Sequence, residues 1–463
     1  MKTIWEKYSN DLSSVMDFNE DYINYLSESK TERENVRNSI ALARKQGFKE
    51  FKEFNRKLQP NDKVYFVNRE KNLSLYIIGK KSLVDGLTIL GAHIDSPRVD
   101  LKQNPVYESD GLVLFDTHYY GGVKKYQWVA TPMALHGVVA KKDGSVINVV
   151  IGEKDTDPVV GFSDLLIHLA QDQLKKDGAK VVEGEDLNLL VGSMPLANDK
   201  DENDKEVERK EPYKDYLLKL LKDMYNIEED DFKTAELEIV PSGKARSYGL
   251  DSSMVIGYGH DDRVCAYTSL RALFEVENPE RTLCCILTDK EEVGSIGATG
   301  MQSRFFENTI AELIDATEDY NDLKLRKALR NSYMLSSDVS AGYDPNYPAV
   351  FEKKNSAFLG KGLVFNKYTG ARGKSGCNDA NPEFIAKIFD VLDKNSVDYQ
   401  TAELGRVDQG GGGTIAYILA NLDMEVIDAG VTVQNMHAPW EVVSKVDVYE
   451  AFLGYKAFLK DIK

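Results

Sequence analysis

Runs of apolar residues alternate with amphipathic stretches along much of the chain. Short apolar runs such as Leu283–Leu287 and Tyr333–Ser336 are typical of buried strands. Stretches with apolar residues at helical spacing, such as Pro382–Asp393, alternate with them. Strands that alternate with helices predict a three-layer α/β/α sandwich, in which functional side chains lie at the carboxyl ends of the strands.

The same pattern recurs near both ends of the chain. Further strands are expected at 64–67, 73–78, 87–90, 253–258, 399–404 and 425–429. Further helices are expected after the capping box Thr31-Glu32-Arg33-Glu34, after Gly259, across 304–329, at 414–420 and as the closing element.

Residues 103–242 have a different pattern of short alternating strands and turns. Strands are expected at Leu112–Phe115, Met133–Ala140 and Val146–Ile151, with a hairpin turn between the last two. A helix is expected at Ser163–Lys176. We therefore expect a β-rich domain, 103–242, inserted into an α/β domain made of 1–102 and 243–463.

The composition and net charge of the chain limit the kinds of molecule that it is expected to bind. The chain has 463 residues, 42% of them hydrophobic, and a net charge of −17. Such a charge argues against binding to nucleic acid or to anionic membranes, which requires clustered Lys and Arg. The first residues lack an apolar signal core, and no apolar run is long enough to span a membrane, so we expect a cytoplasmic protein. The four cysteines lack zinc-site spacing and are expected to be reduced packing residues.

Two adjacent carboxylates, Glu291 and Glu292, follow the strand Leu283–Leu287. On an extended segment they would point to opposite sides, so one can bind a metal while the other carries a proton. A glutamate pair by itself is more often solvated loop charge, and the other candidate residues are what favour a catalytic role.

Five candidate metal ligands fall at or just beyond the ends of predicted strands: His93, Asp261, Glu292, Asp338 and His437. Each alone has an ordinary structural explanation, such as a core histidine or a helix cap. Together, two imidazoles and three carboxylates suit zinc or a similar divalent ion, and five groups are too many for one catalytic ion that keeps a position open. One shared carboxylate gives two sites about 3.5–4 Å apart that share a water or hydroxide. Asp95 is placed to accept a hydrogen bond from His93 and fix its tautomer.

These motifs resemble a known family over nearly the whole chain. In order and spacing, they are similar to those of the aspartyl aminopeptidases, dinuclear zinc exopeptidases that include vacuolar aminopeptidase I; the segments are Gly91–Arg98, Asp261-Asp262-Arg263, Glu291–Ser295, Ser337-Asp338 and Met436-His437. The resemblance implies that His93 and Asp338 hold one ion, Glu292 and His437 the other, and that Asp261 bridges them. It makes Glu291 the general base.

The resemblance also implies an assembly. The family has a catalytic domain interrupted by a dimerisation domain, and it forms a tetrahedral homo-oligomer, typically of twelve subunits. Asp261-Asp262 stands where the eukaryotic aspartyl enzymes have Asp-Asn, and it is closer to the related prokaryotic tetrahedral aminopeptidases. The preference for acidic substrates therefore does not follow, and acidic and neutral N-terminal residues both stay open.

Candidate substrate contacts are fewer. Asp408 and Gln409 precede the glycine run Gly410–Gly413, in which Gly411 allows backbone to approach a ligand; a flexible turn is the alternative. Lys374 and Arg372 would meet an acidic substrate side chain, although basic loop residues are more often solvated. The resemblance implies that His168 reaches a neighbouring subunit's active site, whereas a histidine packed in an interface is the alternative.

We therefore expect an aminopeptidase that acts on peptides and uses two divalent ions, zinc first, with cobalt or manganese as alternatives. Glu291 would take the proton of the attacking water and pass it to the leaving amine. The alternatives are another dinuclear zinc amidohydrolase, such as a carboxypeptidase or deacylase, and a catalytically silent assembly protein on the same scaffold.

Overall fold

The computed structural model describes residues 3–200 and 206–463. Within these residues the chain forms two compact units. The first contains the chain up to Ser96 together with Ala245–Met436 and Trp440–Lys463. The second contains Pro97–Lys244 and also His437–Pro439. In the described part of the chain, no helix has the length and apolar character needed to cross a membrane.

A nine-stranded sheet forms the centre of the first unit, in the order β1-β2-β3-β16-β4-β17-β21-β19-β20. The strands are β1 (Lys49–Glu50), β2 (Lys63–Asn68), β3 (Asn72–Ile77), β4 (Leu87–His93), β16 (Thr282–Thr288), β17 (Tyr333–Ser336), β19 (Leu363–Asn366), β20 (Tyr399–Thr401) and β21 (Glu425–Gly430). The four central strands, β16, β4, β17 and β21, run parallel to one another. Their carboxyl ends therefore meet at one edge of the sheet.

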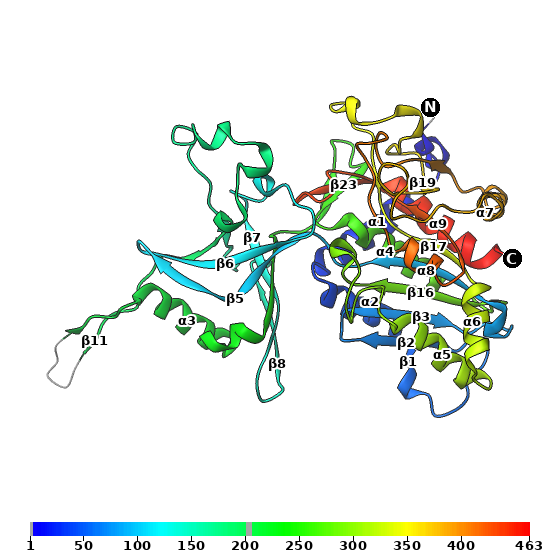
Figure 1. Cartoon of the computed structure of the whole chain (residues 1–463), viewed down its shortest axis with the longest axis horizontal. Coiled ribbons are helices and arrows are strands. Elements are labelled where there is room, and N and C mark those ends of the chain that lie inside the picture. Colours follow the sequence, from blue (N-terminus) through cyan, green and yellow to red (C-terminus); the bar gives the residue numbers. More distant parts are fainter. Residues whose placement is uncertain (1–2, 201–205) are drawn as a thin grey trace. The chain divides into compact units, whose positions relative to one another are not determined.

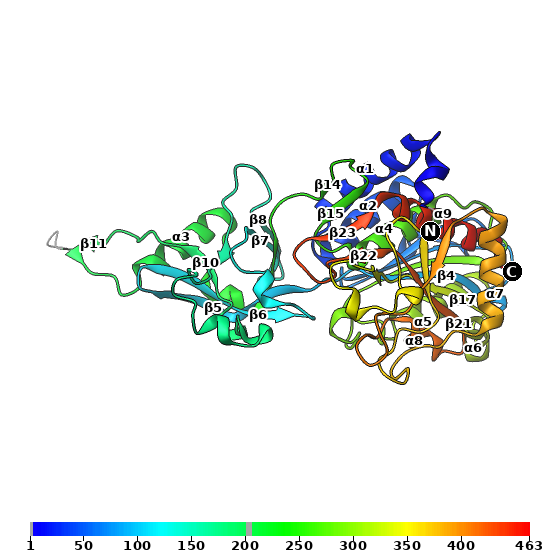
Figure 2. The same cartoon turned by 90° about the horizontal axis from the view of Figure 1, so that it is seen from above.

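Helices cover both faces of this sheet (Figures 1 and 2). One face carries α1 (Leu12–Glu28), α2 (Glu32–Lys45), α4 (His260–Phe274), α7 (Pro382–Lys394) and α9 (Lys445–Asp461), and the other carries α5 (Phe305–Thr317), α6 (Asp322–Arg330) and α8 (Ala416–Ala420). Along β16, Leu283, Cys285 and Leu287 enter one hydrophobic core, whereas Cys284 and Ile286 enter the other. This alternation explains why the strand is apolar at every position from Leu283 to Leu287, and the two cores confirm the predicted sandwich.

A smaller sheet of five strands also belongs to the first unit, in the order β14-β15-β23-β22-β18. Its strands are β14 (Arg246–Tyr248), β15 (Met254–Gly257), β18 (Ser340–Ala341), β22 (Thr432–Gln434) and β23 (Glu441–Ser444). Of these, the hydrophobic pattern predicted only β15. The others are two to four residues long, too short for an alternating pattern to be recognised.

The second unit contains a seven-stranded antiparallel sheet in the order β8-β7-β13-β5-β6-β10-β9. Its strands are β5 (Arg98–Ser109), β6 (Leu112–Tyr120), β7 (Met133–Ala140), β8 (Val146–Ile151), β9 (Gly161–Phe162), β10 (Leu189–Gly192) and β13 (Ala235–Pro241). A helix, α3 (Pro212–Tyr225), the short pair β11 (Asp199–Lys200) and β12 (Glu206–Val207), and several short 3-10 helices also belong to this unit. The hairpin β7–β8 has the predicted bounds.

The helix predicted at Ser163–Lys176 is wrong. This segment consists of turns, with one short 3-10 helix at Gln173–Lys175. Its apolar residues are consecutive, and they are exposed: Leu165 is 55% exposed and Leu169 is 73% exposed. Because these side chains are not packed against an apolar face of the described residues, an amphipathic helix gains nothing here.

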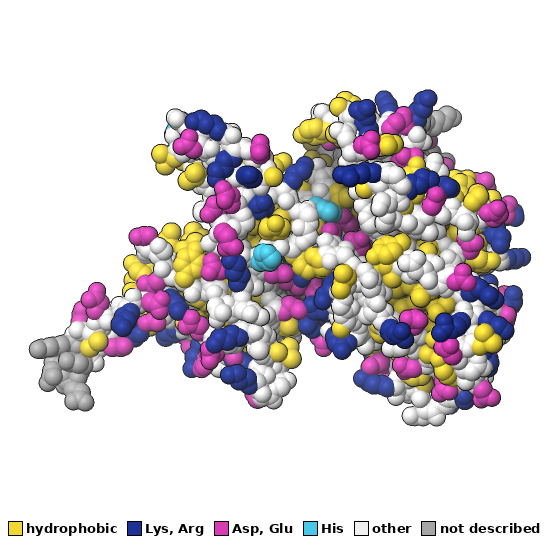
Figure 3. All heavy atoms as spheres, viewed as in Figure 1, with side chains coloured by type: hydrophobic (Ala, Val, Ile, Leu, Met, Phe, Trp, Pro, Cys, Tyr) yellow, Lys and Arg dark blue, Asp and Glu magenta, His cyan; other side chains and the backbone are white. Residues whose placement is uncertain are grey.

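Three of the four cysteines are placed as packing residues, as expected, whereas Cys377 is only partly buried. All four cysteines are free, and three of them, Cys265, Cys284 and Cys285, are buried. On the face shown in Figure 3, Lys and Arg side chains lie interspersed with Asp and Glu rather than in one large basic patch.

Candidate metal centre and active site

His93 is the last residue of β4, and carboxylates contact both of its ring nitrogens. Its Nδ1 lies 3.3 Å from Asp95 Oδ1 and 3.0 Å from the Asp95 carbonyl oxygen. Its Nε2 lies 3.1 Å from Asp261 Oδ1. In the tautomer that has its proton on Nδ1, this proton is donated to Asp95 and Nε2 keeps a lone pair, the arrangement that metal-ligating histidines use.

Glu291 and Glu292 open a short 3-10 helix, η9 (Glu291–Val293), just beyond β16. The expectation of an extended segment is wrong, because Lys290 adopts a left-handed conformation, with φ +70°, that turns the chain before the pair. The backbone N–H groups of Glu291 and Glu292 donate to the Asp95 carboxylate at 3.1 and 3.3 Å. Asp95 therefore holds both the His93 ring and the backbone that carries the two glutamates.

Asp261 and Asp338 approach His93 from two other elements. Asp338 lies two residues beyond β17, and Asp261 lies in the first turn of α4. Asp261 has non-helical dihedral angles, φ −79° and ψ 105°, and the peptide bond that follows it is cis. One potential ligand atom from each of His93, Asp261 and Asp338 lies within 4.8 Å of the others, and the same holds for His93, Glu291 and Glu292.

This set of side chains fits a divalent cation. Burial and the nearby charge of Asp262 raise the pKa of Asp338 well above its ordinary value. Burial disfavours protonation of His93, but its hydrogen bonds with Asp261 and Asp95 outweigh this effect and raise its pKa. Carboxylates gathered at low dielectric repel one another and favour a neutralising cation, and imidazole with carboxylate is a donor set that zinc accepts.

His437 belongs by its contacts to the second unit. Its Nδ1 lies 2.8 Å from the carbonyl oxygen of Gly122, which can accept the Nδ1 proton. Nε2 then carries the lone pair, as in His93. A backbone carbonyl therefore performs for His437 the task that Asp95 performs for His93, and its role as a metal ligand stays a prediction.

Lys374 lies at a cavity of about 380 Å³ formed by the loops 368–374 and 403–410. Its Nζ is 3.0 Å from Asp379 and 4.0 Å from the centre of the Tyr368 ring. Gly410 lines the cavity, and Asp408 and Gly411 lie close to it in sequence. A Cβ on Gly411 would lie 2.6 Å from Ala371 Cα, so the two loops meet there only because the residue is glycine.

The other sequence-based candidate is His168, which lies exposed in the second unit among turns. It is not in a helix, contrary to expectation. Its neighbours Leu166 and Ile167 are each 60% exposed. Its proposed action on another subunit stays a prediction.

Two residues that contact Asp261 were missed from the sequence. Ser96 Oγ donates to the Asp261 carbonyl oxygen at 2.6 Å, and the Asp261 N–H donates to Glu441 Oε2 at 3.0 Å. Ser96 directly follows the His93-x-Asp95 motif, and Glu441 lies four residues after His437. Nearness to ligands was the only sequence signal, because both contacts are to backbone.

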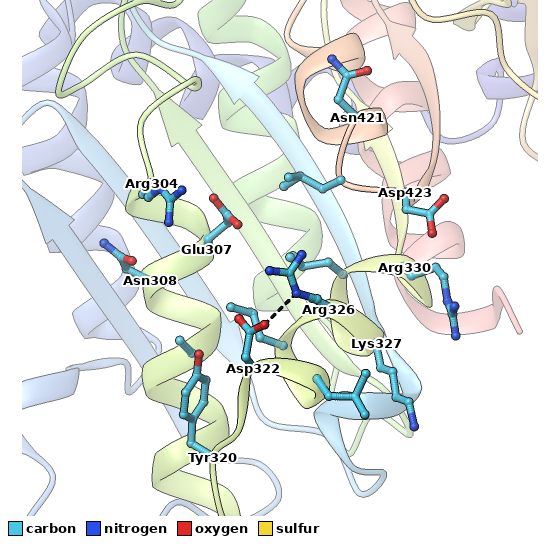
Figure 4. Close-up of a pocket in the computed structure, with 15 residues that line it drawn as sticks. Arg304, Glu307, Asn308, Tyr320, Asp322, Arg326, Lys327, Arg330, Asn421 and Asp423 are labelled. Carbon is cyan, nitrogen blue, oxygen red and sulfur yellow. Dashed lines mark hydrogen bonds and ion pairs between the residues drawn. The ribbon is translucent and has the colours of Figure 1, made fainter.

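A second cavity, of about 660 Å³, lies between α5, α6 and the turn after α8 (Figure 4). Its lining mixes both charges, and Arg326 pairs with Asp322 at 2.7 Å while both remain largely exposed. It contains no histidine, no cysteine and none of the predicted site residues. The candidate site is therefore the cluster at the strand ends.

Comparison with known proteins identifies the family to which the chain belongs. The family model described as aminopeptidase I zinc metalloprotease (M18) matches residues 25–459. The probable M18 family aminopeptidase 1 of Clostridium acetobutylicum is 59% identical over 464 residues, covering 99% of this chain and 98% of that protein.

Solved structures agree. The crystal structure of an M18 family aminopeptidase from Thermotoga maritima has a TM-score of 0.93 and 40% identity, covering 99% of each chain. The S. cerevisiae mApe1 dodecamer has a TM-score of 0.75 over 96% of each chain, but only 19% identity, so this likeness shows the fold alone. The resemblance drawn from the motifs is confirmed: the chain belongs to the aminopeptidase I (M18) family of zinc metalloproteases.

Proposed function

We propose that this chain removes the N-terminal residue from peptides with two bound divalent ions, Zn²⁺ in the first place and Co²⁺ or Mn²⁺ as alternatives. His93 and Asp338 would hold one ion, Glu292 and His437 the other, and Asp261 would contact both. The observation that carries the proposal is the convergence of His93, Asp261 and Asp338 from three separate elements: the end of β4, the first turn of α4 and the loop after β17. Independent structural needs would not bring these three donors together.

When bound, the ions would polarise the scissile carbonyl and lower the pKa of the attacking water. Glu291 would act as the general base: its carboxylate takes a proton from the water and then delivers it to the leaving amine. Glu291 Oε2 lies 4.0 Å from His93 Nε2, which puts it beside the donor set. Asp95 would keep this carboxylate in place through the Glu291 N–H.

The substrate's N-terminal side chain would face the loops at the 380 Å³ cavity, with Lys374, Asp408 and Gly411 as the contacts. Lys374 already has a counter-ion in Asp379. An acidic substrate side chain would therefore have to replace Asp379 at Lys374, which supports an enzyme that also accepts neutral residues.

We further propose a homo-oligomer in which residues 103–242 form a dimerisation domain and dimers assemble into a tetrahedral dodecamer. The exposed apolar residues around His168 support a contact in this region, because such patches are usually covered by a partner. The related mApe1 structure is titled a dodecamer. His168 would then reach the active site of a neighbouring subunit.

We also propose that the protein is cytoplasmic. The four free cysteines support this location, because disulfides are rare in the reducing cytoplasm.

A panel of chromogenic aminoacyl substrates, run on chelated enzyme with each metal restored in turn, tests the reaction, the metal and the selectivity. We expect activity to return with Zn²⁺, Co²⁺ or Mn²⁺ and to disappear when the substrate's amino group is acetylated. Equal release of the chromophore from the acetylated substrate would instead indicate an amidohydrolase that does not need a free amino group, the class that includes deacylases. No turnover with any metal on any free amine would indicate a silent scaffold.

A further inference from the structure

The segment at Asp261 needs hydrogen-bond partners from outside its own helix. With φ −79° and ψ 105°, Asp261 departs from the helical dihedral angles of the rest of α4. Buried peptide groups that leave a regular ladder require other partners. The Asp261 N–H and C=O are bonded to the side chains of Glu441 and Ser96, at 3.0 and 2.6 Å.

Glu441 is an unusual residue to find at such a place. It opens β23, pairs in register with Gly257 of β15, and is only 1% exposed. Burying a carboxylate is costly unless it accepts strong hydrogen bonds. Bonded to the Asp261 N–H, it restrains the backbone from which the Asp261 carboxylate projects.

The neighbouring residue is restrained in the same manner. Nδ1 of His260 lies 2.6 Å from the hydroxyl of Tyr22 on α1, and both side chains are fully buried. Contacts from α1, from the segment after β4 and from β23 therefore converge on two consecutive residues. The Asp261 carboxylate, which projects from this restrained segment, lies 3.1 Å from His93 Nε2.

We propose that Glu441 is a positioning residue for metal binding, which acts by fixing the backbone of Asp261. This inference rests on the proposed ligand role of Asp261. It assigns to Glu441 no contact with substrate or with the reacting atoms. Metal binding tolerates only small displacements of a ligand. Loss of this restraint therefore weakens metal binding more than it affects folding.

The test compares three variants of the full-length chain by titrating the metal-free protein with Zn²⁺ in competition with a chelator. Glu441→Met removes the acceptor while keeping the length of the side chain, and Glu441→Gln keeps a carbonyl oxygen for the Asp261 N–H. Glu450→Met is the matched control, because Glu450 is an equally buried carboxylate that accepts from Lys7 Nζ at 2.7 Å and from the Asp398 N–H at 2.9 Å.

We expect Glu441→Met to raise the Kd for Zn²⁺ by about 10–100-fold. Glu441→Gln should recover most of this affinity. Glu450→Met should lower the Tm of the metal-free chain and leave the Kd unchanged. Wild-type Zn²⁺ affinity in a folded Glu441→Met chain would overturn the proposal, and so would a Glu441→Gln chain that binds as poorly as Glu441→Met.

If Glu441→Met does not fold, Ser96→Ala tests the same restraint at the carbonyl group of Asp261. It removes only the bond to the Asp261 carbonyl oxygen, and we expect a smaller increase in Kd in the same direction. An unchanged Kd in Ser96→Ala would then overturn the proposal. Because the readout is metal affinity, a wild-type chain that binds Zn²⁺ but hydrolyses no peptide would contradict the proposed function and leave this inference intact.

Discussion

The cluster around His93 and the cavity around Lys374 hold their charged side chains differently. Around His93, buried carboxylates bind backbone N–H groups, as Asp95 does with Glu291 and Glu292. Around Lys374, exposed side chains pair with one another, as Lys374 and Lys367 do with Asp379. Buried charges cannot exchange partners with water, whereas exposed pairs contribute little. Substitutions in the first region should therefore change metal binding and chemistry, and those in the second should change selectivity.

The largest effect is expected from Glu291→Gln. Removing the general base should lower kcat by roughly 10²–10⁴-fold. The metal content per chain, measured by elemental analysis, should stay as in the wild type because Glu291 is not a proposed ligand. Glu307→Gln, in the cavity of Figure 4, is the control and should retain full activity. A metal-replete Glu291→Gln enzyme that is active would show that the base is elsewhere.

Asp95→Asn should come second. An amide has one acceptor oxygen in place of two, so the bonds to the Glu291 and Glu292 N–H groups and to His93 cannot all persist. We expect metal affinity, measured by chelator competition, to fall by about 10–100-fold. Asp447→Asn is the matched control, because buried Asp447 also accepts two backbone N–H groups, from Gly360 and Gly362, each at 2.7 Å. Equal losses of affinity in both variants would mean that Asp95 acts only through stability.

Substitutions at the Lys374 cavity should have effects of a few fold. Lys367 and Lys374 lower the pKa of Asp379, so its carboxylate is charged and competes with an acidic substrate. Asp379→Asn should therefore increase kcat/KM for acidic N-terminal residues relative to neutral ones, and Lys374→Ala should decrease that ratio. The measurement is kcat/KM on a matched pair of substrates with N-terminal glutamate and glutamine. A ratio that is unchanged in both variants would remove this cavity from the substrate site.

The smallest effect is expected from Asp428→Asn, at a point where the glycine run meets the sheet. Burial raises the pKa of Asp428 to about 7, against opposing hydrogen bonds from Thr414, which follows the glycines, and from Ser336. The folded state thus binds this proton more tightly than the unfolded state, and wild-type stability falls as the pH rises from about 4 to about 7. Asn removes this dependence.

The Tm difference between Asp428→Asn and the wild type, measured with metal removed, should therefore increase by a few degrees from pH 5 to pH 8. Metal ligands titrate equally in both proteins and cancel in the difference. A difference that is constant with pH would show that Asp428 does not titrate in this range.

The sequence predicted those elements that are buried on both faces. The interiors of β16 and β17 are apolar because each strand faces two cores. The polar residues just beyond these strands, including Glu292 and Asp338, were therefore easy to recognise in the sequence. Few structural roles would account for His93, Asp261, Glu292, Asp338 and His437 all at once. The motifs that contain them could therefore be recognised as one set.

The features that the sequence did not predict depend on the three-dimensional surroundings of the residues or on the conformation of the backbone. The apolar residues Leu165–Leu169 resemble a helix only if a packing surface exists for them, and the described residues offer none. Glu441 and Ser96 act through the peptide group of Asp261, whose dihedral angles the side-chain pattern does not encode. The turn at Lys290, which changes how Glu291 and Glu292 project, is likewise a backbone property.

The short return of His437–Pro439 into the second unit limits how the protein could be shortened. Gly122, whose carbonyl oxygen contacts the His437 ring, lies within the inserted segment. A truncated chain that lacks this insertion would retain all five proposed ligands in its sequence, yet one imidazole would lose the carbonyl that orients it. A chain shortened by removal of the insertion would therefore keep His437 without the hydrogen bond that orients its ring.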